Sequence, residues 1–214
     1  MKMLNEQVRE QLKGLLNKMD KKVVIAVFTK ENPCETCEET KLFMEELEEI
    51  GEKITLKKYH LYNDEEMAKK YEVTLTPSIV ILDENENYKG IKFNGIPAGH
   101  EINSFLSTIM AVSGSGNNLP EEVNSKLQSI KKPVDIKVFV TLGCPHCPGA
   151  VEKANLIALQ NSNIKSQMIE AQTFPELSDK FNVSSVPKVV INDKYEFVGN
   201  QPIEMFLQEI EKTQ

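Results

Sequence analysis

Residues 23–37 read VVIAVFTKENPCETC, and residues 135–147 read DIKVFVTLGCPHC. In both stretches an apolar run rich in β-branched residues leads through a short polar turn to two cysteines with two residues between them. An apolar run bounded by turn residues predicts a buried strand, and the residues after each cysteine pair have helical periodicity. Both stretches therefore predict the same order of strand, Cys-x-x-Cys and helix.

The spacing between these two stretches recurs further along the chain. The first cysteines, the second cysteines and the prolines of two Xaa-Pro steps are each 110 residues apart: Cys34 and Cys144, Cys37 and Cys147, Pro77 and Pro187. Self-similarity at a fixed offset is the signature of a repeated unit. The chain is therefore predicted to consist of two copies of one fold, each with its own cysteine pair.

The polar stretch SGSGNN at residues 113–118 separates the two copies. Gly/Ser-rich segments bury little surface and suit a connection between domains. The length of 214 residues fits two domains of about 100 residues each. We expect an N-terminal domain at 1–113 with Cys34/Cys37 and a C-terminal domain at 119–214 with Cys144/Cys147.

Periodicity predicts the same series of elements in both copies. An amphipathic helix within 1–20, or at 121–131, comes first. Strands follow at 23–29, 54–60, 78–82 and 88–93, and again at 136–141, 164–170, 188–191 and 195–198. Helices are expected at 38–51, 65–71 and 101–112, and again at 150–160, 176–181 and 203–211. Strands separated by a helix pair in parallel and the final tight pair is an antiparallel hairpin, so each copy is an α/β fold with a central mixed sheet and helices on both faces.

Composition excludes several classes of partner. Apolar residues make up 40% of the chain and charged residues 27%, as in globular proteins. The 25 basic and 32 acidic residues give a net charge of -7, which supplies no positive field for nucleic acid or anionic lipid. The N-terminus lacks the continuous apolar run of a signal peptide, and no stretch of about 18 apolar residues occurs. We therefore expect a cytoplasmic protein that binds neither nucleic acid nor membrane.

Paired cysteines at the start of a helix favour redox chemistry. In a reducing cytosol such pairs are usually catalytic or metal-binding. Positions i and i+3 lie about 5–6 Å apart, within reach of a disulfide. The helix dipole favours a thiolate at the first cysteine, which can attack a substrate disulfide and then be released by the second sulfur. The sequence therefore predicts dithiol–disulfide exchange.

Two other interpretations of the cysteines remain open at this point. Two Cys-x-x-Cys pairs can bind a structural zinc ion, although the gap from Cys37 to Cys144 far exceeds the usual spacing of about 15–20 residues. Inert buried thiols fit less well, because Pro33 and Pro145 with their polar neighbours suggest accessible turns. We expect no bound metal and keep a zinc-bound or redox-inactive interaction module as the alternative.

The motifs resemble those of the thioredoxin superfamily and, within it, the two-domain glutaredoxin-like protein disulfide oxidoreductases. The resemblance covers nearly the whole chain, including the run FVGNQP at 197–202. A similar tandem that retains only the second pair occurs at the N-terminus of bacterial alkyl hydroperoxide reductase flavoproteins. The resemblance implies two tandem thioredoxin-like folds, protein disulfides as substrates, no bound cofactor, and electrons from NADPH through a thioredoxin-reductase-like flavoprotein. It also allows a dedicated electron donor to one peroxidase or reductase.

The resemblance assigns a role to the two Xaa-Pro steps as well. It implies that Pro77 and Pro187 follow cis peptide bonds in loops that face the cysteine pairs. In related folds the residue before this proline pairs through its backbone with a bound chain, like an added strand. Thr76 and Val186 would then contact the substrate, together with Pro77 and Pro187.

The residues between the cysteines differ between the copies. Glu35 places a negative charge near Cys34 and disfavours its thiolate, whereas a protonated His146 beside Cys144 favours one. The Cys-Pro-His-Cys site is therefore predicted to be the more reactive and the more oxidising. Thioredoxins proper have a buried acid in the strand before the pair, whereas the strand residues Ile25, Ala26, Val27, Ile136 and Val138 offer none, so the sequence does not identify the group that assists proton transfer.

Overall fold

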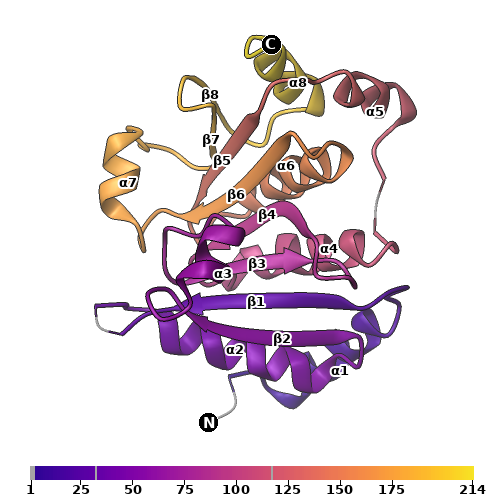
Figure 1. Cartoon of the computed structure of the whole chain (residues 1–214), viewed down its shortest axis with the longest axis vertical. Helices are drawn as coiled ribbons and strands as arrows, with labels where there is room; N and C mark the ends of the chain where they lie inside the picture. The colour runs from indigo at the N-terminus through magenta and orange to yellow at the C-terminus, as the bar shows by residue number, and fades with distance from the viewer. Residues whose placement is uncertain (1–2, 32, 117) are drawn as a thin grey trace.

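The computed structural model describes residues 3–31, 33–116 and 118–214. Within these residues a single sheet of eight strands crosses both halves of the chain, in the order β2-β1-β3-β4-β6-β5-β7-β8 (Figure 1). The strands are β1 Val23–Thr29, β2 Ile54–His60, β3 Ser78–Leu82, β4 Tyr88–Asn94, β5 Val134–Val140, β6 Ile164–Glu170, β7 Lys188–Ile191 and β8 Tyr195–Val198. These strands lie within two residues of the predicted bounds.

Helices occupy the predicted segments, with differences at their ends. They are α1 Glu6–Leu16, α2 Cys37–Ile50, α3 Glu65–Lys70, α4 Ile102–Val112, α5 Glu121–Gln128, α6 Cys147–Gln160, α7 Pro175–Lys180 and α8 Ile203–Glu211, with a 3₁₀ turn η1 at Gly99–Glu101. The largest differences are three residues: α6 begins three residues before the predicted Ala150, and α5 ends three residues before the predicted Lys131. The earlier start of α6 is compatible with Pro148, because proline tolerates the first turn of a helix, where its missing N–H is not needed.

Strand pairing confirms the predicted parallel pair and antiparallel hairpin in each half, whereas the antiparallel pairing of the third strand with the first was not predicted. β1 pairs in parallel with β2 and antiparallel with β3, and β3 pairs antiparallel with β4. β5, β6, β7 and β8 repeat this arrangement. The two four-stranded units then join through a parallel pairing of β4 with β6, from Ile91 beside Ser166 to Asn94 beside Ile169. The sequence predicts a sheet in each half but not that the two form one sheet.

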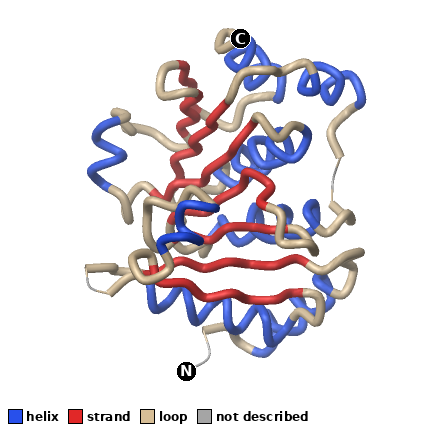
Figure 2. The backbone as a smooth tube through the Cα atoms, viewed as in Figure 1, coloured by secondary structure: helices blue, strands red, loops and turns tan. Residues whose placement is uncertain are grey.

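Helices cover both faces of this sheet, as predicted (Figure 2). On one face α1, α2, α4, α5, α6 and α8 bury a single apolar core that runs across both halves. On the other face α3 and α7 cover two smaller, separate clusters, one around Phe28 and Tyr71 and one around Phe139 and Phe181. Alternate residues of β1 serve the two faces, which explains why nearly every residue of this strand is buried.

A buried polar network lies where the two halves meet. Asn155 of α6 donates to Thr108 Oγ1 of α4 at 2.9 Å, and Ser166 Oγ of β6 donates to Asn155 Oδ1 at 2.7 Å. Since buried polar groups are costly unless they are paired, these bonds fix how α4, α6 and β6 pack together. Of the predicted connection at 113–118, Asn117 lies outside the described residues, as do Met1 and Lys2 of the predicted N-terminal domain. The domain bounds stay a prediction.

The strand directions place both cysteine pairs at the same end of the sheet, where the parallel strands have their carboxyl ends. β1, β4, β6 and β5 all run in the same direction, because β3 lies antiparallel to both β1 and β4. The pairs follow the carboxyl ends of β1 and β5, so both lie at this end of the sheet. β3, β4 and β6 lie between those two strands, and four steps of about 4.8 Å separate their axes by roughly 19 Å.

Candidate active sites

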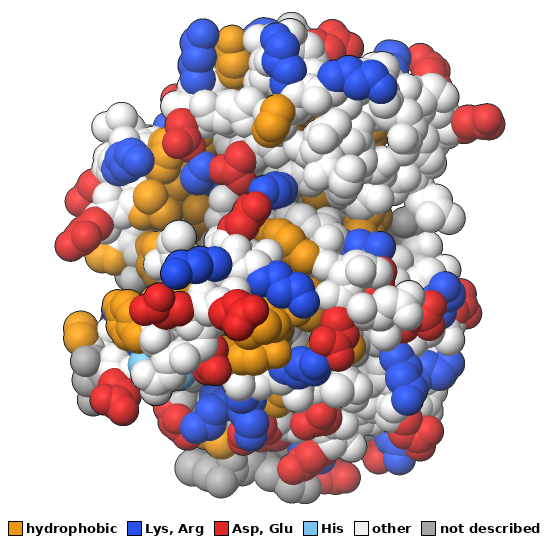
Figure 3. Space-filling model, in the orientation of Figure 1, with side chains coloured by type: hydrophobic (Ala, Val, Ile, Leu, Met, Phe, Trp, Pro, Cys, Tyr) orange, Lys and Arg blue, Asp and Glu red, His pale blue; other side chains and the backbone are white. Residues whose placement is uncertain are grey.

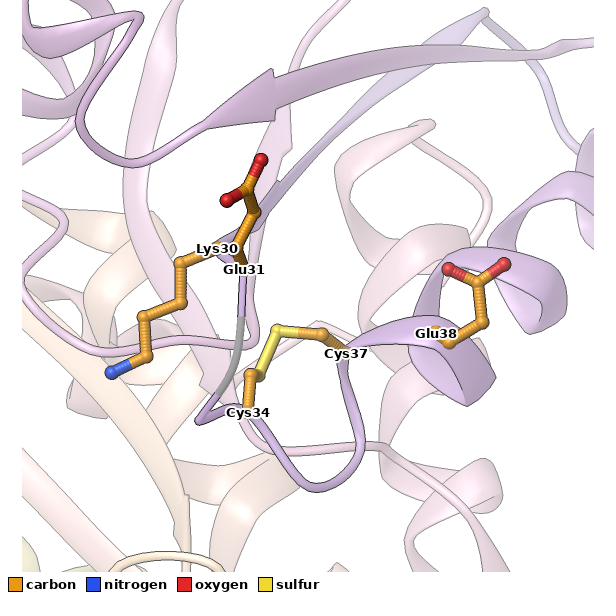
Figure 4. Close-up of a pocket in the computed structure, with 5 residues that line it drawn as sticks. All are labelled: Lys30, Glu31, Cys34, Cys37 and Glu38. Carbon is orange, nitrogen blue, oxygen red and sulfur yellow. A yellow bond between two sulfur atoms is a disulfide. The ribbon is translucent and has the colours of Figure 1, made fainter.

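The N-terminal pair forms a disulfide at the start of α2 (Figure 4). Cys34 and Cys37 are bonded, with their Cα atoms 5.5 Å apart. Cys34 lies in the turn after β1 and is half-buried, whereas Cys37 is the first residue of the helix and only 7% exposed. The outer sulfur is therefore the predicted nucleophile, and the inner one is placed to resolve a mixed disulfide.

Acidic side chains surround this N-terminal pair. A hollow of about 560 Å³ beside the disulfide is lined by Lys30, Glu31, Cys34, Cys37 and Glu38. Glu38 and Glu39 occupy the first turn of α2. They compensate the positive end of the helix dipole that would otherwise stabilise a thiolate at Cys34. Glu38 and Glu39 thus add two acidic side chains to Glu35 at this end of the helix, and all three are exposed, so solvent screens their effect on Cys34.

The C-terminal pair repeats the geometry with different neighbours. Cys144 and Cys147 form a disulfide with the same Cα separation of 5.5 Å. Cys147 is fully buried and begins α6, Cys144 is 9% exposed, and no acidic residue occupies the first turn of that helix. His146 is exposed at the N-cap position. The dipole of α6 is therefore not compensated at this pair.

Both predicted cis peptide bonds are confirmed. Thr76–Pro77 and Val186–Pro187 are cis. In the C-terminal half the Val186 carbonyl oxygen lies 3.8 Å from Cys144 Sγ, so this loop lies directly against the cysteine pair. The assignment of Thr76, Pro77, Val186 and Pro187 to substrate contact stays a prediction.

Glu35 and His146 are both exposed to solvent. Water and salt screen the field of an exposed side chain, so either charge acts weakly on its neighbouring sulfur. The roles of these two side chains stay predictions. The contrast in the first turns of α2 and α6 points in the same direction as the one predicted from them.

Sequence analysis missed a buried acid in η1, the 3₁₀ turn that contacts α6. Glu101 is fully buried in η1, and η1 contacts α6. Burial raises the pKa of Glu101 to about 7, although Ser104 Oγ donates a hydrogen bond to its Oε2 at 2.5 Å. The other oxygen, Oε1, has no hydrogen-bond partner among the described residues.

Backbone contacts hold η1 against the loop that carries the second pair. His100 donates its backbone N–H to the carbonyl oxygen of Leu142 at 3.0 Å, two residues before Cys144. Gly99 has φ +57°, and a Cβ there would lie 2.4 Å from the same Leu142 oxygen. Only glycine allows this approach. In the sequence Glu101 looks like an ordinary acid at a helix start, because its burial depends on residues of the other half.

The described part of the chain has neither a metal-binding cluster nor a membrane-spanning helix. It contains no group of three or more His, Cys, Asp or Glu residues that could hold a metal ion. The separation between β1 and β5 also keeps the four sulfurs from one tetrahedral zinc site, in which each zinc–sulfur bond is about 2.3 Å. Within the same residues no helix is long and apolar enough to cross a membrane.

Comparison with known proteins identifies the family. A family model described as thioredoxin domain matches residues 134–212. The solved structure of a protein disulfide oxidoreductase from Aeropyrum pernix K1 is 31% identical, with 98% of this chain and 93% of that chain covered and a TM-score of 0.91. The chain belongs to the thioredoxin superfamily. Because that likeness spans both halves, the chain is a tandem of two thioredoxin-like folds.

A second group of similar proteins has the same tandem of thioredoxin folds. The solved structure of the alkyl hydroperoxide reductase AhpF from Enterococcus faecalis is 31% identical, covers 97% of this chain and 99% of that chain, and has a TM-score of 0.90. The AhpF protein of Staphylococcus aureus is 28% identical over 211 residues, which are 99% of this chain and 38% of that protein. The chain thus spans about two fifths of the length of the curated relatives it matches.

Two Cys-x-x-Cys pairs in disulfide geometry, each placed at the start of a helix in a thioredoxin fold, make this chain a thiol–disulfide oxidoreductase. Both sulfurs of each pair are within bonding distance, so each pair can take up or give two electrons by closing or opening its own disulfide.

Proposed function

We propose that the chain reduces, oxidises or isomerises disulfides of other proteins through both pairs. Cys34 and Cys144 are the nucleophiles, and Cys37 and Cys147 resolve the mixed disulfides. The observation that carries this proposal is the layering of each pair, with the first cysteine in the turn and the second buried at the first residue of the helix. In each pair the first cysteine is the more exposed of the two, so a substrate reaches its sulfur first.

Exchange at the C-terminal pair proceeds in two balanced steps. The Cys144 thiolate attacks one sulfur of the substrate disulfide, forms a mixed disulfide and releases the other substrate sulfur as a thiolate, which takes up a proton. Cys147 then loses its proton and attacks Cys144 Sγ, which closes the Cys144–Cys147 disulfide and releases the second substrate thiol. Two electrons pass from the dithiol to the substrate, and the reverse sequence oxidises a substrate dithiol.

We also propose Glu101 as the proton acceptor, a role that the sequence did not reveal. Cys147 is fully buried, so its thiol cannot lose its proton directly to bulk water. A carboxyl group whose pKa is raised to about 7 exists in both protonation states near neutral pH, and this is the condition for efficient proton transfer. We assign Glu101 to the deprotonation of Cys147 through the contact of η1 with α6.

The cis-proline loops are the proposed binding sites for the substrate backbone. Val186 lies at the edge of the C-terminal pair, where its backbone can pair with an extended substrate segment while the substrate sulfur meets Cys144. Thr76, which precedes the cis Pro77 in the other copy of the repeat, is proposed for the same role at the N-terminal pair. Pro77 and Pro187 fix the two loops.

The two disulfides need an external source of electrons if the chain is to act as a reductase. Likeness to the alkyl hydroperoxide reductase AhpF supports an NAD(P)H-dependent flavoprotein as the partner that reduces the two disulfides, in the manner of a thioredoxin reductase. The same likeness favours a second candidate function, in which this chain donates electrons to one peroxidase or reductase. Both functions require the same two dithiols, and we propose a cytoplasmic location for either of them.

Insulin reduction in the presence of dithiothreitol tests the proposal. The wild type, Cys34→Ser, Cys144→Ser and the double variant are compared in the full chain. We expect each single variant to retain activity and the double variant to fall to the rate of dithiothreitol alone. Equal activity of the wild type and the double variant would contradict the proposal. Replacement of dithiothreitol by NADPH and thioredoxin reductase then tests the source of electrons.

A further inference from the structure

A groove lies beside the N-terminal pair and is built by both halves of the chain. Its volume is about 600 Å³. The N-terminal half contributes Lys30, Pro33 and Leu75, and the C-terminal half contributes 173–177 and Lys180, at the start and end of α7. In Figure 3 hydrophobic side chains show along the left margin, at α7 and at the loop below it that follows β1.

Lys30 joins this groove to the hollow at the disulfide, because it lines both. It follows β1 directly, four residues before Cys34, and its side chain points away from the Cys34–Cys37 bond (Figure 4). Leu75 immediately precedes Thr76 of the cis-proline loop. A chain held by that loop with its sulfur at Cys34 therefore has its neighbouring residues at the mouth of the groove.

The lining of the groove combines apolar surface with unpaired positive charge. Pro33, Leu75, Phe174, Pro175 and Leu177 are apolar. Lys180 Nζ lies 5.2 Å from the ring of Phe181, and neither Lys30 nor Lys180 forms an ion pair with another described residue. Two lysines against the single Glu176 give this groove a positive balance on a chain whose net charge is -7.

We propose that this groove binds the segment of a protein substrate that flanks the cysteine attacked by Cys34. It selects segments that carry an apolar residue next to an acidic one. This inference rests on the proposed function of the N-terminal pair. The C-terminal half, through α7, thus sets the substrate preference of the N-terminal site.

Two peptide disulfides test the preference. Each contains a disulfide flanked by leucine and one charged residue, which is glutamate in one peptide and lysine in the other. The full chain with Cys144→Ser and Cys147→Ser is reduced, freed of reductant and mixed with each peptide. Closure of the Cys34–Cys37 disulfide then accompanies the opening of the peptide disulfide into two thiols. We expect the glutamate peptide to react faster than the lysine peptide.

Charge reversal at Lys180 identifies the groove as the cause. In the same background, Lys180→Glu should slow the glutamate peptide roughly two- to fivefold, which is the range for one exposed ion pair, and should speed up the lysine peptide. Lys22→Glu is the matched control, because exposed Lys22 lies at the opposite end of β1. Bis(2-hydroxyethyl) disulfide has no flanking residues, so its rate should be the same in all three proteins.

Other outcomes overturn the inference in distinguishable ways. If Lys180→Glu leaves both peptide rates unchanged while the small disulfide still reacts, the groove does not select substrates and the proposed function stands. If neither the peptides nor the small disulfide react, the proposed function of the N-terminal pair fails first. A dimer in sedimentation that Lys180→Glu dissociates would assign the groove to a second copy of this chain.

Discussion

At the scale of single residues, the protonation of Glu101 should govern how stability depends on pH. Burial raises its pKa to about 7 from an ordinary 4.5, so the folded chain keeps a proton that the unfolded chain loses between these values. The stability that this group contributes is complete below pH 4.5 and is lost as the pH rises through 7. Glu101→Gln should therefore be more stable than the wild type at pH 8, by about 3 kcal/mol, and similar at pH 4. Urea unfolding at both pH values checks this, and an equal gap at both would contradict it.

The same substitution should separate the two active sites kinetically. Glutamine cannot accept a proton, so Glu101→Gln should slow closure of the Cys144–Cys147 disulfide by roughly 100-fold. The Cys34–Cys37 pair should keep its rate, since Glu101 lies in the contact of η1 with α6. Single-turnover oxidation of each pair, measured with the other pair changed to serine, checks both statements. Equal slowing of the two pairs would indicate a structural effect.

At the scale of elements, Asn155 fixes how the two halves pack against each other. It links α4, α6 and β6 through buried hydrogen bonds to Thr108 and Ser166. Asn155→Leu leaves two buried hydroxyl groups without this partner and should lower the free energy of unfolding by about 1–3 kcal/mol. Asn103→Leu, at an exposed position of α4, is the matched control and should change it by less than about 0.5 kcal/mol. Chemical denaturation measures both, and equal effects would contradict the role of the network.

At the scale of the whole molecule, the two pairs should act independently. Thiol–disulfide exchange requires direct contact of sulfurs. The strands that carry the pairs are separated by β3, β4 and β6, a distance of roughly 19 Å. The insulin-reduction rate of the wild type should therefore equal the sum of the rates of Cys34→Ser and Cys144→Ser, each with its unchanged pair active. Loss of all activity in one single variant would instead indicate a relay between the sites.

Local patterns in the sequence predicted most of this architecture, but they did not predict the contacts between the two halves. The run at 23–29 is apolar because both faces of its strand are buried, and 134–140 alternates Asp135 and Lys137 with buried apolar residues before its apolar end; both signals are local. The pairing of β4 with β6 joins residues more than 70 positions apart, and nothing in Ile91–Asn94 distinguishes a free edge from a joined one. Glu101 and the groove at α7 depend on that junction, so both appear only in the folded chain.

The central claim is that one chain carries two unequal dithiol sites, and the ionisation of the two nucleophiles tests it most directly. The first turn of α2 carries Glu38 and Glu39, whereas that of α6 carries no acid. The rate of alkylation by iodoacetamide is measured across a pH series for Cys34 and for Cys144, each with the opposite pair changed to serine. We predict that Cys144 reacts with the lower apparent pKa. A lower apparent pKa at Cys34, or equal values at the two cysteines, would contradict the account.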